Sequence, residues 1–285
     1  MAQTYTDGKV QVVVVDDGST DESYRVIQRY SRHLTTVFKS NGGEASAVNA
    51  GFEVCEGDIV CMLDADDYFS PKKVEDVVSA FHAYPIAQWH FHPLLKIRDS
   101  RKNTTRRLMT CIYGHTPPQL IDYRQNVRRG DRMPLLPATS GLSFKRSLLE
   151  ENLPIPLIFR TCADAYLRLA AIADAPGLLS PRTLAVHRIH GNNLFEGRNN
   201  AEIIALHVYI WLSDVTQQYR PFTKPFTNRL FAHAVGRLAA YRGWRYALSS
   251  PEVSSYFQSL ESPLTRLHCA NRALFNCARC HLQQR

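Results

Sequence analysis

The stretch Asp-Ile-Val-Cys-Met-Leu-Asp-Ala-Asp-Asp-Tyr-Phe-Ser-Pro at 58–71 decides the fold that we expect for this chain. Its apolar run from Ile59 to Leu63 is typical of a buried strand, and it stops at the carboxylates of Asp64, Asp66 and Asp67. Open α/β sheets bind ligands at such strand ends. In extended backbone, Asp64 and Asp66 point to the same face, where they can address one Mg²⁺ or Mn²⁺ ion. Alternatively, both are ordinary loop carboxylates, and Asp67 caps the helix that follows.

A second acidic strand end lies earlier in the chain. The apolar run from Val10 to Val15 predicts a strand covered on both faces, and it delivers Asp16 and Asp17 to its end. Ser19 and Glu22 have the spacing of a capping box, which predicts that a helix begins there. The two aspartates could simply cap this turn, but two acidic strand ends in one small domain are hard to explain as chance.

Strands and helices alternate through the first hundred residues. We expect strands at 35–38 and 88–94, a helix that follows the Gly-Gly turn and reaches residue 52, and another that opens at Pro71. Three alternations of this kind predict a parallel, doubly wound sheet. From Ala201 onward the apolar periodicity is helical, and we recognise no chemistry there.

Two later positions carry polar side chains that suit a site. Asp164 falls in the first turn of a helix that begins near Thr161, where a carboxylate also complements the helix dipole. His190 follows the strand expected at 184–189 and stands beside a glycine and two asparagines. A lone histidine is more often structural, but imidazole together with carboxylate suits Mn²⁺ or Mg²⁺ held on a diphosphate.

Composition limits the class of protein. The chain has 285 residues and a net charge of +8, and ten basic against three acidic residues lie between Lys96 and Arg132. This segment suits phosphates or an anionic membrane surface, although a solvated loop is the simpler interpretation, and it lacks the interleaved aromatics that nucleic-acid binding favours. Seven irregularly spaced cysteines and a polar N-terminus without a signal peptide predict a cytoplasmic protein. Cys277, Cys280 and His281 match haem-attachment spacing only formally, and we expect neither haem nor zinc there.

Four landmarks, in order and spacing, resemble family 2 of the inverting glycosyltransferases, which have the GT-A fold. They are the Val-Val-Val-Val-Asp-Asp-Gly-Ser-Thr-Asp run at 12–21, Asn-Gly-Gly with Asn-Ala-Gly at 41–51, Gly-Asp-Ile-Val-Cys-Met-Leu-Asp-Ala-Asp-Asp at 57–67, and the later Ala-Asp-Ala-Tyr-Leu with Arg-Ile-His-Gly. The resemblance implies a Rossmann-like α/β fold with a mostly parallel sheet flanked by helices. The glycosyltransferase domain would span 1–198, with a nucleotide-sugar half at 1–95 and an acceptor half at 96–198, followed by a helical extension at 199–285.

The resemblance also implies a role for each candidate residue. Asp17 would hold the nucleobase, Asp64 the ribose and Asp66 the metal, with His190 as a second metal or diphosphate contact and Asp164 as the general base. Asp16 and Asn41 would belong to the same donor site. The donor would be a UDP-, GDP- or dTDP-sugar, the cofactor Mn²⁺ or Mg²⁺, and the acceptor a hydroxyl group of a glycan, glycolipid or protein. We expect acceptor or membrane-surface contacts in the basic segment.

The chain departs from this family at its N-terminus. Members usually begin with a strand that carries a Pro-x-Tyr-Asn-like turn and then a helix, so a unit of roughly thirty residues would be missing before Gln3. Val48 stands where many members have arginine. The missing unit motivates a second hypothesis, a catalytically silent nucleotide-sugar-binding or scaffold protein. A third hypothesis is a nucleotidyltransferase that makes the activated sugar, because such an enzyme shares the sheet and the metal carboxylates. It would normally have a Gly-rich, basic loop after its first strand.

Overall fold

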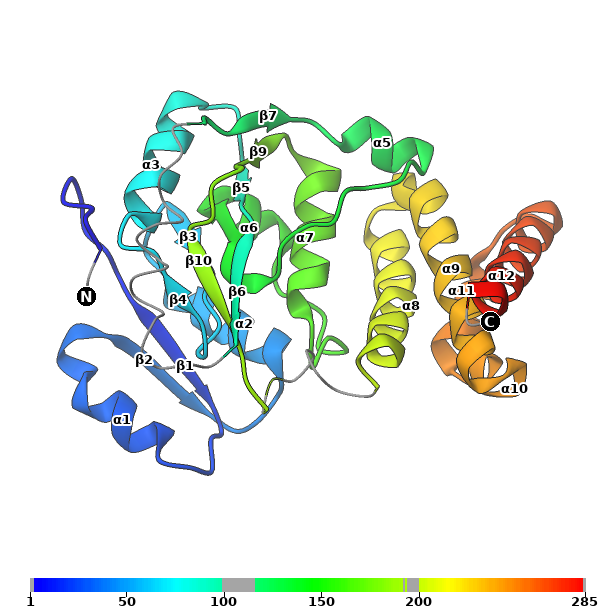
Figure 1. The fold of residues 1–285 in the computed structure, drawn as a ribbon, viewed down its shortest axis with the longest axis horizontal. Helices are drawn as coiled ribbons and strands as arrows, with labels where there is room; N and C mark the ends of the chain where they lie inside the picture. The colour runs from blue at the N-terminus through cyan, green and yellow to red at the C-terminus, as the bar shows by residue number, and fades with distance from the viewer. Residues whose placement is uncertain (1–2, 99–115, 192, 194–199, 284–285) are drawn as a thin grey trace. The chain divides into compact units, whose positions relative to one another are not determined.

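The computed structural model describes residues 3–98, 116–191, 193 and 200–283. The chain divides into two compact units, each built from two stretches of sequence (Figure 1). Unit 1 comprises Met1–Arg124 and Pro134–Asn192, and unit 2 comprises Gln125–Met133 and Asn193–Arg285. Residues 99–115 of the predicted basic segment lie outside the described residues. In the described part of the chain, no helix combines the length and the apolar character that a bilayer crossing requires.

Unit 1 contains the strands, with helices flanking them (Figure 1). Its strands are β1 (Val13–Asp17), β2 (Thr35–Lys39), β3 (Ile59–Cys61), β4 (Tyr68–Phe69), β5 (Trp89–Phe91), β6 (Leu94–Arg98), β7 (Gln119–Ile121), β8 (Leu142–Lys145), β9 (Gly177–Leu179) and β10 (Ala185–Ile189). Its helices are α1 (Ser23–Arg29), α2 (Glu44–Glu53), α3 (Lys73–Ala83), α6 (Arg146–Asn152) and α7 (Ala163–Asp174), with 3-10 turns η1 (Ser31–His33) and η2 (Thr139–Gly141).

The strands form three hydrogen-bonded groups, ordered β1-β2, β4-β10-β6 and β3-β8-β5-β9-β7. The α/β fold with a helical region at its C-terminal end is confirmed, but the pairing is mixed. β1 and β2 are parallel, as are β10 and β6, whereas β8 runs antiparallel between β3 and β5. A parallel pair requires a crossover connection. β8 instead enters from a long loop and runs the opposite way, which the helix–strand alternation of the first hundred residues could not reveal.

The local predictions fail at strand and helix ends. β1 begins three residues later than the apolar run and extends through both of its aspartates. The capping box is wrong: helix α1 starts at Ser23 without a side-chain cap from Glu22, and the Ser23 N–H donates to Asp21 Oδ1 at 2.9 Å instead. The Ser19 N–H, which Glu22 would accept in a capping box, donates to Asp16 Oδ1 at 2.8 Å instead.

A buried lysine lies beneath the five-stranded sheet. Lys73, in the first turn of α3, is 0% exposed, and its Nζ lies 2.6 Å from His92 Nε2 and donates to Ser143 Oγ at 2.9 Å. The ammonium also lies over the Phe69 ring, 5.3 Å from its centroid. Burial lowers the pKa of Lys73 from 10.5 to about 8, because the charged form loses its water.

This lysine predicts a rise of stability with pH. Between its folded and unfolded pKa values the unfolded chain binds the extra proton, so the free energy of unfolding should increase by about 2 kcal/mol from about pH 7.5 to about pH 9.5. We expect Lys73→Met to flatten this rise and Lys72→Met, at the exposed neighbouring position, to keep it. Urea unfolding at the two pH values measures the difference. If the free energy of unfolding rose equally with pH in both variants, the rise could not be assigned to Lys73.

Unit 2 is helical. Its elements are α5 (Arg124–Arg129), α8 (Ala201–Tyr219), η3 (Pro221–Thr223), α9 (Lys224–Arg242), α10 (Trp244–Leu248), α11 (Pro251–Ser259) and α12 (Pro263–Gln283). Its core includes Phe231 stacked on Tyr256, with ring centroids 4.0 Å apart. Cys277 and Cys280 are buried on the inner face of α12, whereas His281 is exposed. The three side chains therefore do not converge as metal or haem ligands.

Candidate active site

The carboxylate of Asp17 organises the first strand end. It accepts hydrogen bonds from Lys39 Nζ at 2.6 Å and from the Gly42 and Gly43 N–H groups at 2.9 and 2.7 Å. Burial opposes the charge, but these three donors outweigh it and hold the pKa of Asp17 below its usual value. Asp17 thus joins β1 to the loop that opens α2.

The Gly-Gly turn lies against the loop that precedes α7. Gly43 has φ +87°, and a Cβ there would lie 2.7 Å from Arg160 Cα. The Glu44 N–H donates to Arg160 O at 3.0 Å, and the Ala45 N–H donates to Phe159 O at 3.1 Å. Only glycine tolerates both the backbone angle and this close approach. Segments more than a hundred residues apart are therefore joined at the start of α2.

Asp16 and Asn41 occupy the same edge in different ways. Asp16 is buried and its Oδ1 accepts the Ser19 N–H at 2.8 Å, so it shapes the turn after β1. Asn41 is exposed, and its Oδ1 accepts a hydrogen bond from Arg160 at 2.9 Å. Asn41 therefore presents its amide nitrogen at the surface of the candidate site, whereas Asp16 serves the loop.

The loop after β3 is a turn, not the extended backbone that we expected. The Asp67 N–H donates to Asp64 O at 3.0 Å, which closes the turn. Asp64 and Asp66 therefore do not leave a strand on one face, and each carboxylate has its own surroundings. The Asp64 N–H donates to Ser140 Oγ at 3.1 Å, and that hydroxyl donates to Asp67 Oδ2 at 2.6 Å.

Asp67 holds the turn to β10. Its fully buried carboxylate accepts the Arg188 N–H at 3.0 Å and lies 3.2 Å from His187 Nδ1. Burial raises its pKa, but the hydrogen bonds from His187, Ser140 and Arg188 prevail, and the pKa of Asp67 is lowered. Asp67 is thus a charged anchor between two strand ends. It does not cap the helix after Pro71.

Asp66 and His190 come together from segments 124 residues apart. His190 Nε2 lies 3.0 Å from Asp66 Oδ2, and the two side chains are 25% and 34% exposed. The Arg188 side chain donates to the Asp66 carbonyl oxygen and stacks on Tyr68, with its guanidinium carbon 4.9 Å from the ring centroid. The two predicted metal contacts are therefore neighbours at an accessible edge.

Asp164 lies in the first turn of α7 and is 8% exposed. Arg168, one turn later, places a guanidinium nitrogen 3.2 Å from Asp164 Oδ2 and donates to Pro137 O at 2.6 Å. The residue before α7, Cys162, has φ +56°, a backbone conformation uncommon for a residue other than glycine. The carboxylate is therefore held in a fixed direction by an arginine that is itself anchored.

Asp64, Asp164 and Glu44 form a cluster of like charge. Burial, and then the negative charges of Asp67, Asp164 and Asp66, raises the pKa of Asp64 to about 7. Burial, and then Asp164 and Asp64, raises the pKa of Glu44 to about 7. Like charges close enough to act in this way attract a cation or a proton. The structure thus brings Asp64 and Asp164 together across a hundred residues of sequence.

A divalent cation fits the donor set of Asp66 and His190. A carboxylate oxygen and an imidazole nitrogen lie side by side, partly exposed, next to further negative charge. Within the described residues no group of three or more His, Cys, Asp or Glu side chains could hold a metal ion. A cation bound here would take its other ligands from water or from phosphate oxygens, as Mg²⁺ usually does.

Sequence reasoning missed Glu44 and the role of Asp67. Asp67 carried a signal, since it belongs to the same acidic run, but its partners lie on β10 and beside η2. Glu44 followed the Gly-Gly turn, where an acidic residue suits the first turn of a helix. Its neighbour Asp164 comes 120 residues later, so no local pattern could pair them.

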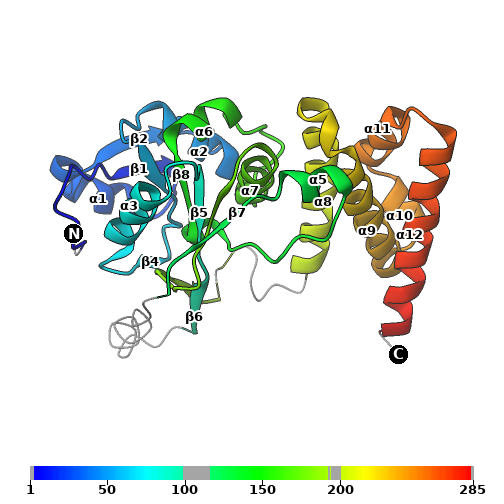
Figure 2. The same cartoon turned by 90° about the horizontal axis from the view of Figure 1, so that it is seen from above.

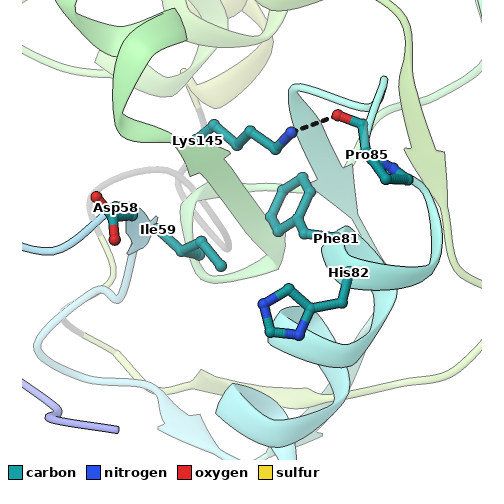
Figure 3. Close-up of a pocket in the computed structure, with 6 residues that line it drawn as sticks. All are labelled: Asp58, Ile59, Phe81, His82, Pro85 and Lys145. Carbon is teal, nitrogen blue, oxygen red and sulfur yellow. Dashed lines mark hydrogen bonds between the residues drawn. The ribbon is translucent and has the colours of Figure 1, made fainter.

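A hollow elsewhere in unit 1 is not the candidate site. It is lined by Asp58, Ile59, Phe81, His82, Pro85 and Lys145 (Figure 3). Lys145 Nζ donates to Pro85 O across it at 2.5 Å. Asp58 and Ile59 stand where β3 begins, whereas the acidic turn follows the end of that strand. The hollow and the carboxylates are therefore at opposite ends of β3.

Comparison with known families gives one match. The sequence model described as glycosyl transferase family 2 matches residues 1–151, which is more than half of the chain. This stretch contains the Asp17 and Asp66 loops and ends before α7, so Asp164 and His190 lie beyond it.

Curated relatives agree with that match. An uncharacterized glycosyltransferase of Nostoc sp. is 32% identical over 198 residues, which cover 68% of this chain and 59% of the relative. An undecaprenyl-phosphate 4-deoxy-4-formamido-L-arabinose transferase of Pseudomonas syringae pv. syringae is 30% identical over 35% of this chain and 30% of its own length. The chain thus spans less than two thirds of the length of either relative.

Solved structures share the fold at low identity. S. aureus TarS 1-349 in complex with UDP-GlcNAc has a TM-score of 0.63 at 13% identity, covering 97% of this chain and 82% of that one. Mannosyltransferase PcManGT from Pyrobaculum calidifontis, in complex with GDP-Man and Mn²⁺, has a TM-score of 0.54 at 19% identity, covering 99% and 77%. At these identities, the likeness to both structures concerns the fold of this chain.

Proposed function

The chain belongs to glycosyltransferase family 2, and from this we propose that it is a metal-dependent inverting transferase that moves a sugar from a nucleotide-diphosphate donor to a hydroxyl acceptor. One observation carries the proposal. Asp64, Asp66, Asp164 and His190 come from three distant segments, yet Asp66 contacts His190 and Asp164 perturbs Asp64. A scaffold protein would not need this convergence of charge, so we do not retain the catalytically silent alternative.

The donor would bind along the ends of β1 and β3. Lys39, Gly42 and Gly43 already donate to the Asp17 carboxylate, with the Gly42 N–H reaching both oxygens. A nucleobase N–H would therefore share one of these oxygens with the donors already bound there. Asp64 would accept from the ribose hydroxyls, and the free amide nitrogen of Asn41 would add a donor. Asp16 would support the site through the turn that it closes.

Asp164 would act as the general base. A sugar hydroxyl is a weak nucleophile, and a positioned carboxylate must take its proton as it attacks the anomeric carbon. Arg168 Nη1 holds Asp164 Oδ2, which leaves Oδ1 to receive that proton. Attack opposite the leaving diphosphate inverts the anomeric centre, and no covalent intermediate on the protein is required. Arg168 therefore orients the Asp164 carboxylate, which is also largely shielded from water.

Asp66 and His190 would hold the Mn²⁺ or Mg²⁺ ion. When bound there, the ion supplies positive charge that neutralises the departing diphosphate. Arg188 fixes the Asp66 backbone by its bond to the carbonyl oxygen, so the Asp66 carboxylate keeps its direction. The two ligands sit on loops that Asp67 ties together, which preorganises the pair before any ligand arrives.

The acceptor class follows from the relatives. One relative is named as an undecaprenyl-phosphate sugar transferase, and another, 39% identical over 28% of this chain and 12% of its own length, is chondroitin synthase of Escherichia coli. Their names support an acceptor from polysaccharide, glycolipid or protein-glycan assembly.

Calorimetric titration with UDP and with GDP tests the donor site. We expect one of the two nucleotides to bind in the presence of Mn²⁺ and to lose most of its affinity when a chelator replaces the metal. Failure of both nucleotides to bind with Mn²⁺ would refute the donor site. Equal affinity with metal and with chelator would refute the metal dependence while leaving the donor site intact.

A further inference from the structure

Helix α12 has a buried face and an opposite apolar face. Its buried side chains, Cys269, Ala273, Cys277 and Cys280, point into the core of unit 2. Gly236 of α9 lets the two helices approach so closely that a Cβ there would lie 2.2 Å from Ala273 O. Within unit 2, α12 packs on α9 and has its other side turned outward (Figure 2). One face of the helix is therefore fully used in folding.

The outward face carries large apolar side chains along the whole helix. Their exposed fractions are 77% for Leu264, 58% for Leu267, 54% for Leu274, 65% for Phe275 and 74% for Leu282. Their spacing of three, seven and eight residues places them on one side of a helix, over a length of about 27 Å. We call these five residues the outer stripe. Asn271 is exposed on the same face between Leu267 and Leu274. Scattered exposed leucines are ordinary, but five large apolar side chains on one helix face indicate a contact surface.

The charge around the stripe is of one sign. Helix α12 contains Arg266, Arg272 and Arg279 and no aspartate or glutamate. Across residues 221–285 there are nine lysines and arginines against two glutamates. Arg279 is exposed and Arg272 is partly exposed. Arg266 is also exposed, but its guanidinium donates to Leu260 O at 2.8 Å and to Gln258 O at 3.3 Å. The surface that surrounds the outer stripe therefore favours an anionic partner.

We propose that the outer stripe lies in the interface of an anionic lipid bilayer, with α12 parallel to the membrane plane and Arg272 and Arg279 on lipid phosphates. An amphipathic helix with an apolar stripe and a cationic polar face has this behaviour. A second copy of the chain is disfavoured, because two α12 faces would bring six arginines together without a counter-charge. The stripe is also a flat face: the shallow hollow beside Leu264 and Leu267 is lined by α12 residues alone, so it does not form a groove for a peptide.

The test is co-sedimentation of the full chain with vesicles, without nucleotide or metal, so that it does not depend on the proposed transferase activity. Wild-type protein should pellet with phosphatidylcholine vesicles that contain phosphatidylglycerol and should stay in solution with phosphatidylcholine alone. Leu267→Ser with Phe275→Ser should weaken the binding at least about tenfold, because two apolar side chains that the bilayer would bury are lost. Arg272→Gln with Arg279→Gln should weaken it about thirtyfold, at about a kcal/mol for each cation.

Leu157→Ser is the matched control, because Leu157 is 62% exposed in unit 1. It should pellet like the wild type, and circular dichroism should show unchanged helix content in every variant. The proposal is overturned if wild-type protein does not bind the anionic vesicles, or if the Leu267/Phe275 variant binds them as well as the wild type does. If the wild type does not bind vesicles but forms a dimer in solution, and the same variant is monomeric, the outer stripe is the contact with a second copy. Binding to an acidic protein without vesicle binding would assign it to a protein partner.

Discussion

Replacing Asp164 with asparagine is expected to lower the kcat of sugar transfer by about 10²- to 10⁴-fold, the range that a positioned general base contributes. The amide cannot accept the proton of the attacking hydroxyl. It keeps the shape of the side chain, and Arg168 keeps its bond to Pro137 O, so α7 should stay in place. The rate is measured as the release of UDP or GDP from the corresponding nucleotide sugar in the presence of an acceptor.

Asp174→Asn provides the control at the other end of the same helix. It removes one carboxylate from α7 without touching the site, and transfer should continue near the wild-type rate. In Asp164→Asn the affinity for the donor nucleotide should change little, because Asp164 would act on the acceptor. An Asp164→Asn enzyme with wild-type kcat would exclude this residue as the base and leave Glu44 as the nearest candidate.

Replacing Asp66 with alanine is expected to reduce nucleotide affinity in Mn²⁺ to the level seen with chelator, and to lower transfer by about 10²- to 10³-fold. This corresponds to losing several kcal/mol of charge stabilisation from a metal ion. The substitution removes the only ligand oxygen that we place on the ion and leaves His190 Nε2 without its 3.0 Å neighbour. Titration with and without Mn²⁺ measures the first effect, and nucleotide release measures the second.

Asp58→Ala is the matched control for that substitution. Asp58 precedes β3 and Asp66 follows it, so the two changes remove the same group from opposite ends of one strand. The control should keep metal-dependent binding. If Asp66→Ala still responds to Mn²⁺ as the wild type does, the ion must be held by other residues, and the roles of Asp66 and His190 would both have to be abandoned.

The sequence predicted those features whose signal lies in a short stretch of residues. Strand ends with carboxylates marked the loops at Asp17 and Asp66, and apolar periodicity marked α2, α3 and the helices after residue 200. The alternation of strands and helices indicated the α/β fold, and the family resemblance grouped Asp164 and His190 with these loops in one expected site. Each of these inferences used residues that stand close together or recur in a known order.

The remaining features depend on partners that are distant in sequence. β8 pairs antiparallel with β3 and β5, which lie more than fifty residues earlier in the chain, so its own residues do not reveal its direction. The turn at Asp64 forms because Ser140 and β10 supply partners for Asp67. The capping box failed because the Ser19 N–H was already bound to Asp16. A single sequence carries no record of such competition among hydrogen-bond partners.

The amides at the start of α2 have a consequence for how this sheet treats phosphate. In dinucleotide-binding sheets, a glycine-rich loop leaves helix N–H groups free, and the ligand's pyrophosphate receives them. Here the N–H groups of Gly42, Gly43, Glu44 and Ala45 all donate within the protein, to Asp17 and to the loop before α7. A diphosphate at this edge finds no vacant amide cradle. On the proposed function, a divalent cation that enters with the diphosphate would balance its charge in place of these amides, so we expect nucleotide affinity to rise with the concentration of divalent cation.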